Sequence, residues 1–204
     1  PLRREDRADV PLVDEKRYNM TALMWASQMG RTEVVELLLN KSASVDEEDT
    51  EGDTALMQAS QEGHTEAVKL LLDKGALINK QAKGGDTALM LASQADHTEV
   101  VKQLLAKSAS VNLKDKYGNT ALLQASQRGR TEVVKLLLEK GALVDEKTKH
   151  GETALLQASQ KGHSKVVKLL LEKVASVNEK DHNLGWTALM WWSWEGHTEV
   201  VKLL

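Results

Sequence analysis

TALLQASQKGHSKVVKLLL, at residues 153–171, is the stretch that decides the fold, because the chain repeats it with variations. Its opening triplet, Thr-Ala-Leu, occurs six times, with spacings of 33, 33, 33, 33 and 34 residues. The triplets begin at Thr21, Thr54, Thr87, Thr120, Thr153 and Thr187. A fixed period of this length is typical of proteins built from stacked copies of one small unit, in which each copy packs against its neighbours.

Each copy predicts two short helices joined by a turn. The threonine hydroxyl can cap the first helix, and a glycine such as Gly63 or Gly162 suits the left-handed turn that ends it. The third copy has Asp96 there, one of the few other residues that tolerate this conformation. The second helix carries apolar residues around most of its circumference, so it needs neighbours on both sides. We therefore expect an all-α fold, a solenoid of helix–turn–helix units.

A polar stretch closes each unit, for example VDEKTKHGE at residues 144–152. A glycine two residues before the threonine predicts a tight turn at the tip of a projecting loop, and Asn19 takes this place in the first copy. We place a polar tail or cap at residues 1–12. The six units then span about residues 13–45, 46–78, 79–111, 112–144, 145–177 and 178–204.

These motifs resemble the ankyrin-repeat family over roughly residues 13–204. The family pattern has Gly-x-Thr-Pro-Leu-His at the start of a repeat, Gly-His between its helices and Leu-Leu-Leu-x-x-Gly-Ala-x-Val-Asn at its end. Gly63-His64 matches the middle, and LLEKGALVD at residues 137–145 matches the end. The start departs, because every copy has Thr-Ala-Leu, and Met57 or Leu156 replaces the usual histidine. We expect the hydrogen bonds of that histidine to be lost.

The resemblance implies projecting finger loops and a concave groove lined by the first helices. It also implies a protein-binding role, although members of one fold bind many different partners. A further departure concerns the residue after the second helix, where Ser42, Ser108 and Val174 replace the expected glycine. If the backbone is left-handed there, each of these residues costs on the order of 1–2 kcal/mol.

Composition excludes several functional classes. The net charge is −3, without the basic excess of a general nucleic-acid binder. Cysteine is absent, and no apolar run approaches the ~18 residues of a membrane span. We see no signal region and expect an intracellular, cytoplasmic protein. Equivalent polar residues recur in every copy instead of converging on one place, so we predict no catalytic residues, no metal site and no cofactor.

Histidines and glutamines recur at fixed slots. We interpret His64, His97 and His163 as residues that orient the turn between the two helices. One glutamine slot lies near the end of the first helix, and the resemblance places it on the groove; it holds Gln28, Gln61, Gln94, Gln127 and Gln160, joined by Gln58, Gln124 and Gln157 one turn earlier. Two interpretations remain open for this slot: a hydrogen-bonding groove floor, or good helix formers inherited on a solvated face.

The neighbouring slot at the end of the first helix varies from copy to copy, as a surface that recognises a partner would. It holds Met29, Glu62, Ala95, Arg128, Lys161 and Glu195. From these slots, the tyrosines and the tryptophans we choose a set of candidate partner-binding residues. They are Tyr18, Trp25, Met29, Gln58, Glu62, Gln94, Tyr117, Gln124, Arg128, Gln157, Lys161, Trp186, Trp191 and Trp194.

Four of the five tryptophans lie in the last copy. Trp192 replaces an alanine that packs between helices in the other copies, where a tryptophan would clash. The tryptophans are therefore either a binding surface or an improvised cap of the solenoid end. We expect weak end-to-end self-association through this copy, with Trp192 and Leu203 at or beside the contact.

We predict a non-catalytic module that binds a protein through its finger loops and the concave face of its first helices. The alternative is a structural spacer, or an engineered, consensus-like scaffold without a natural ligand.

Overall fold

The computed structural model describes residues 19–182 and 184–196. Within these ranges the chain forms eleven helices and no strand. The first helices of the repeats are α1 Ala22–Gln28, α3 Ala55–Glu62, α5 Ala88–Ala95, α7 Ala121–Gln127, α9 Ala154–Gln160 and α11 Ala188–Glu195. The second helices are α2 Thr32–Asn40, α4 Thr65–Asp73, α6 Thr98–Ala106, α8 Thr131–Glu139 and α10 Ser164–Glu172. A twelfth helix was expected in residues 197–204, outside the described residues.

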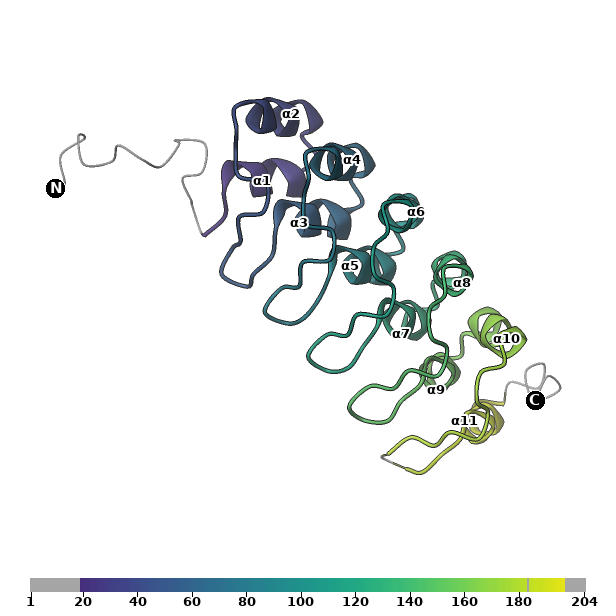
Figure 1. Cartoon of the computed structure of the whole chain (residues 1–204). Coiled ribbons are helices and arrows are strands. Elements are labelled where there is room, and N and C mark those ends of the chain that lie inside the picture. Colours follow the sequence, from purple (N-terminus) through teal and green to yellow (C-terminus); the bar gives the residue numbers. More distant parts are fainter. Residues whose placement is uncertain (1–18, 183, 197–204) are drawn as a thin grey trace.

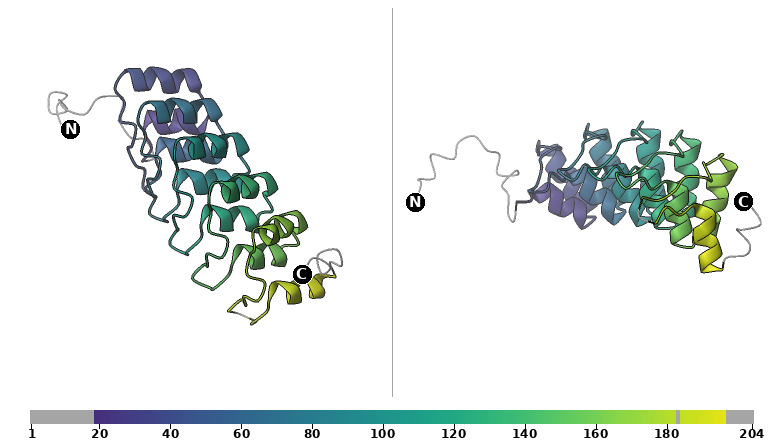
Figure 2. Two further views of the ribbon diagram at one scale, coloured as in Figure 1. Left: turned by 45° about the vertical axis from the view of Figure 1, so that its right-hand side comes forward. Right: turned by 90° about the horizontal axis from the view of Figure 1, so that it is seen from below.

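The helices stack in two layers, as predicted from the period. Odd-numbered helices follow one another in one layer, and even-numbered helices form the other (Figures 1 and 2). The finger loops all project from the side of the odd-numbered layer (Figure 1). Each helix contacts its counterpart in the next repeat, so the fold is a linear stack in which every repeat meets only its neighbours.

The threonine of each Thr-Ala-Leu triplet caps the first helix, as expected. Its hydroxyl oxygen accepts the backbone N–H of the residue three positions later, at 3.2 to 3.4 Å in all six copies. The residue after the helix is left-handed, with φ near 79° at Gly63 and 71° at Asp96. The sequence signals for both ends of the first helix are therefore confirmed.

The residue after the second helix is also left-handed, whether or not it is glycine. Ser42, Ser108 and Val174 have φ of 62°, 66° and 61°, against 87° at Gly75. Val174 is a β-branched residue, for which this conformation is strained. Its side chain is exposed, so no packing offsets the strain.

The core runs continuously along the stack. Alanine, leucine and methionine or leucine at the start of each internal first helix are buried, as are the valines and leucines on the inner side of the second helices. The repeats therefore share one hydrophobic core, and the first helices that carry the candidate residues pack on it.

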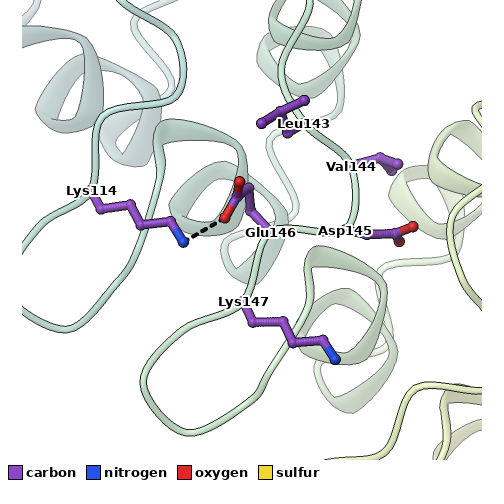
Figure 3. A pocket seen from close by; sticks show the side chains of 6 residues that line it. All are labelled: Lys114, Leu143, Val144, Asp145, Glu146 and Lys147. Atoms are coloured by element: carbon purple, nitrogen blue, oxygen red, sulfur yellow. Dashed lines mark ion pairs between the residues drawn. The ribbon is translucent and has the colours of Figure 1, made fainter.

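Polar contacts set the register between neighbouring repeats. After α2, α4, α6 and α8, an Asp or Asn side chain accepts a backbone N–H from the segment that follows the next second helix. These pairs are Asp46 with Leu77, Asn79 with Ser110, Asn112 with Leu143 and Asp145 with Ser176, at 2.8 to 3.0 Å. Ion pairs follow the same line: Lys80–Glu48, Lys114–Glu146 and Lys147–Glu179. Figure 3 shows Glu146 turned toward Lys114, while Lys147 points away from both.

A histidine clasp also joins neighbouring repeats. The Nε2 atoms of His64, His97 and His163 lie 2.9, 2.9 and 3.0 Å from a main-chain oxygen at the end of the preceding first helix. The histidines therefore hold the turn, as interpreted, but they do so across the joint. A Cβ built on Gly63 would lie 2.3 Å from the His97 ring, so this position requires glycine for space as well as for its φ.

One joint uses a different clasp. The left-handed residue there is Asp96, and Arg130 stands where the next repeat normally has histidine. The Arg130 Nε donates to the main-chain oxygen of Gln94 at 3.1 Å, and its guanidinium lies 3.7 Å from the Asp96 carboxylate. Both departures from the repeat pattern thus belong to one contact.

Candidate functional site

The finger loops form one hydrogen-bonded ridge in the middle of the stack. The backbone N–H groups of Lys83, Lys116 and Lys149 donate to main-chain oxygens of the preceding finger, each at 2.8 Å. Within a finger, Asp49 accepts the N–H groups of Glu51 and Asp53, both at 2.9 Å. A ridge held in this way is ordered before a partner arrives, which lowers the entropy cost of binding.

The variable slot at the end of the first helices is accessible. Met29, Glu62, Arg128 and Lys161 are exposed, and Ala95 is half-buried. The slot runs from apolar and acidic in repeats one and two to basic in repeats four and five. It is therefore a line of unlike side chains on an otherwise uniform layer of helices.

The tip of the fourth finger adds an aromatic and a cationic group. Tyr117 is exposed, and the Lys116 ammonium lies 5.0 Å from the centre of its ring. This distance permits a cation–π contact. Lys116 belongs to a row of exposed tip lysines that also includes Lys83 and Lys149. Sequence reasoning missed this row, although the residues lie 33 positions apart.

The structure corrects the expectation for three candidate glutamines. Gln58 and Gln124 are each only 8 % exposed and Gln157 only 3 %, so they offer a partner little surface. Their amide groups instead donate to acidic side chains of the fingers: Gln58 to Asp49 at 3.4 Å, Gln124 to Asp86 at 3.2 Å and Gln157 to Glu152 at 3.3 Å. These glutamines brace the fingers against the first helices, and we remove them from the proposed contact surface.

The third and the last repeats have other residues at this slot. The third repeat has Leu91 at the slot and Ala82 at the finger position of Asp49, and both are partly buried against the core. The last repeat has Trp191, whose indole N–H donates to Asp181 at 3.0 Å. Asp181 occupies the same finger position as Asp49 and Asp115. Trp191 therefore replaces glutamine as a hydrogen-bond donor.

Acidic side chains gather where the second and third fingers meet the helices. Burial raises the pKa of Asp53 to about 6, and the nearby carboxylates of Asp49, Asp86 and Glu51 raise it as well. Asp53 is thus partly protonated near pH 6, and its charge makes this part of the groove less stable at neutral pH. No group of three or more potential metal ligands that could hold a metal ion occurs in residues 19–182 and 184–196.

Three tryptophans of the last repeat pack together. The ring centre of Trp186 lies 4.8 Å from that of Trp191 and 5.7 Å from that of Trp194, with tilted and edge-on geometries. Trp194 is largely exposed, and Trp186 and Trp191 are half-buried. Trp186 and Trp194 also line a hollow with Leu189, Met190 and Ser193.

Trp192 is set apart from this cluster, because its side chain is fully buried. It fills the interior of the last repeat and presents no surface to a second molecule. Trp192 was expected at or beside an end-to-end contact; its burial leaves only a position beside such a contact. Leu203, named with it, lies outside the described residues.

Two further candidates lie in the first helices of their repeats. Trp25 is exposed in the first repeat, and Gln94 is half-buried in the third. Tyr18 lies outside the described residues. No helix among those described is long and apolar enough to cross a membrane.

Comparison with known proteins agrees with the repeat architecture. A family model described as ankyrin repeats (3 copies) matches the chain over residues 6–82, 75–148 and 142–204. These segments overlap and together cover nearly the whole chain. A search of curated proteins finds no match.

Proposed function

The chain belongs to the ankyrin-repeat family, whose members are generally protein-interaction modules and typically not enzymes, and we propose that it binds a protein partner through its fingers and groove. The variable slot carries the proposal. In repeats one to five this slot holds methionine, glutamate, alanine, arginine and lysine, whereas the alanine and serine slots beside it stay the same and buried. A repeat surface that recognises one partner needs exposed slots whose residues differ between repeats, and buried slots whose residues stay the same to keep the packing.

The charges of the slot indicate how a partner would lie. Arg128 and Lys161 are exposed in repeats four and five, whose fingers carry the exposed lysines Lys116 and Lys149. A partner segment with acidic side chains therefore fits this half of the groove. Met29 and Trp25 in the first repeat offer apolar contacts at the other end.

Two sets of charge reversals test the proposal. The groove variant carries Arg128→Glu and Lys161→Glu, and the matched back variant carries Lys135→Glu and Lys168→Glu on the exposed side of α8 and α10. All four residues are exposed, so both variants should keep the fold and change the net charge equally. We expect a protein that is captured by the wild-type chain to be captured by the back variant and lost with the groove variant.

The opposite pattern would reject the groove as the binding surface. A captured set that is identical for all three proteins would also reject it, and would favour a passive spacer.

A further inference from the structure

Two residues of α6 depart from the repeat pattern on one face of the helix. Gln103 occupies a slot that holds leucine in the other described second helices: Leu37, Leu70, Leu136 and Leu169. Ala106 occupies a slot that holds a polar residue in those helices: Asn40, Asp73, Glu139 and Glu172. Residues three positions apart are neighbours on a helix surface. The third repeat therefore combines an added amide with a shortened side chain at one place.

Both departures line the same pocket between α4 and α6. The two helices are neighbours in the even-numbered layer (Figure 1). The pocket has a volume of about 250 Å³ and is lined by Lys69, Leu72, Asp73, Gln103, Ala106 and Lys107. It lies in the middle of the stack, between two helices whose residues are all described.

The walls of this pocket are mostly apolar. Leu72 is partly buried against the core, and Ala106 contributes a methyl group. Lysine side chains cover apolar surface with their methylene stems while the ammonium group stays in water. The ammonium group of Lys107 lies 3.0 Å from the Asp73 carboxylate, and both side chains are about half exposed. These two charges therefore pair with each other at the edge of the pocket.

Gln103 gives the pocket a buried polar atom. Its Oε1 has no hydrogen-bond partner among residues 19–182 and 184–196. A buried acceptor without a donor costs free energy, and the leucine of the other repeats avoids that cost. A hydrogen-bond donor supplied by a ligand would remove it.

We propose that this pocket binds a small planar aromatic ligand with one N–H donor, of the size of indole, and that the donor bonds to Gln103 Oε1. The ring matches the apolar walls, and the donor matches the buried carbonyl oxygen. The volume favours this size, because pockets for drug-sized molecules start at roughly 300 Å³ and benzene fits a cavity of about 150 Å³.

The proposal does not depend on partner binding. The pocket lies between second helices, and its lining includes none of the candidate partner-binding residues. A ligand here and a partner in the groove therefore occupy different layers of the stack, and each can be tested without the other.

NMR titrations of the full chain test the proposal, with indole as the probe and benzofuran as the matched ligand. Benzofuran has the shape of indole but carries an oxygen in place of the N–H group. We expect indole to bind with a Kd of roughly 1 mM, as is typical of so small a ligand. The backbone amide signals of Leu72, Gln103 and Ala106 should shift. Benzofuran should bind about fivefold more weakly, because it has no hydrogen to donate.

Three variants separate the hydrogen bond from the shape of the pocket. Gln103→Met keeps the length of the side chain and removes the carbonyl oxygen, so indole and benzofuran should bind with equal affinity. Ala106→Leu should fill the pocket and abolish binding of both. Glu172→Leu is the matched control, because it places leucine at the same slot of α10, and it should bind indole like the wild-type chain. Circular dichroism checks that each variant is folded.

Absence of indole binding up to about 10 mM would overturn the proposal. Equal affinity of the wild-type chain for the two ligands would also overturn it, as would an unchanged preference for indole in Gln103→Met. Signal shifts that centre on Trp186 and Trp194 instead of α4 and α6 would place the ligand in the hollow of the last repeat and would equally reject this site.

Discussion

Repeats five and six have the same plan and differ in the size of the residues they place in it. At four slots, repeat five has an acidic, an alanine and two amide side chains, and repeat six has tryptophan at all four. The replaced residues are Glu152, Gln157, Ala158 and Gln160, and their counterparts are Trp186, Trp191, Trp192 and Trp194. The helix α9 contacts a first helix on both sides, and α11 contacts one only on the side of α9.

The difference shows which constraint acts on each slot. Ala158 is held between two neighbouring helices, so only a small side chain fits there. Trp192 is equally buried, in a helix whose described first-helix contact is with α9. Trp191, by contrast, keeps the hydrogen bond that glutamine makes in other repeats. At the slot of Ala158 and Trp192, the space between helices decides how large the side chain can be. At the slot of Gln157 and Trp191, the side chain must donate a hydrogen bond to the finger.

The largest effect is expected when tryptophan is placed at the alanine slot of an internal repeat. Ala125 of α7 is fully buried between α5 and α9. Ala125→Trp should lower the free energy of unfolding by more than about 3 kcal/mol, because the added ring overpacks a close joint. Urea unfolding followed by circular dichroism measures the loss. A loss below about 1 kcal/mol would mean that internal joints have unfilled space.

The reverse change should have a somewhat smaller effect. Trp192→Ala removes a fully buried ring and should cost about 3 kcal/mol, because the lost side chain leaves a cavity. The loss should concentrate in α11. Amide hydrogen exchange would show faster exchange there and unchanged exchange in α3 to α7. Equal acceleration throughout the stack would contradict a local role for Trp192.

A third change concerns the left-handed residue that ends repeats four and five. Val174→Gly should stabilise the protein by about 1 kcal/mol, because glycine adopts a positive φ without strain. Gly141→Val is the matched control and should destabilise by a similar amount, since a Cβ at Gly141 would meet nothing within 4 Å and only the backbone matters. Denaturant melts of both variants provide the test. If Val174→Gly brings no gain, the strain is absent.

The smallest effect is expected in the second finger. Asp53 has its pKa raised to about 6 in the folded protein, so between pH 4 and 6 the folded chain holds a proton that the unfolded chain releases. Asp53 therefore lowers stability as the pH rises through this window. Asp53→Asn, which copies Asn119 of repeat four, should raise the melting temperature at pH 7 and leave it unchanged at pH 4. Solvent screening keeps the gain below about 1 kcal/mol. A gain of the same size at both pH values would show that the charge is not its cause.

Much of the architecture could be predicted because it is local and repeated. The Thr caps, the left-handed turns at Asp96 and Val174, and the two-layer stack all depend on residues within one 33-residue unit. The clasp of Asp96 with Arg130 was harder to predict, because it joins two units. The sequence nevertheless contained a signal for this clasp, because Asp96 and Arg130 replace the usual glycine and histidine at two positions that meet across one joint.

The candidate site was harder to predict than the fold. The burial of Gln58 and Gln157 depends on how closely a finger folds back on its helix, which the period does not reveal. The available signal for these contacts was a glutamine nine residues after a finger aspartate, as in Asp49 with Gln58 and Asp115 with Gln124. The exposure of Arg128, Lys161 and Tyr117, in contrast, follows directly from their slots.

The central claim is that the concave side, and not the back, is the binding surface. Titration calorimetry with the purified captured protein tests it most directly. The account predicts that Arg128→Glu with Lys161→Glu weakens the affinity at least tenfold, about 1.4 kcal/mol, and that Lys135→Glu with Lys168→Glu changes it less than twofold. An affinity that survives the groove changes but falls tenfold with the back changes would contradict the account.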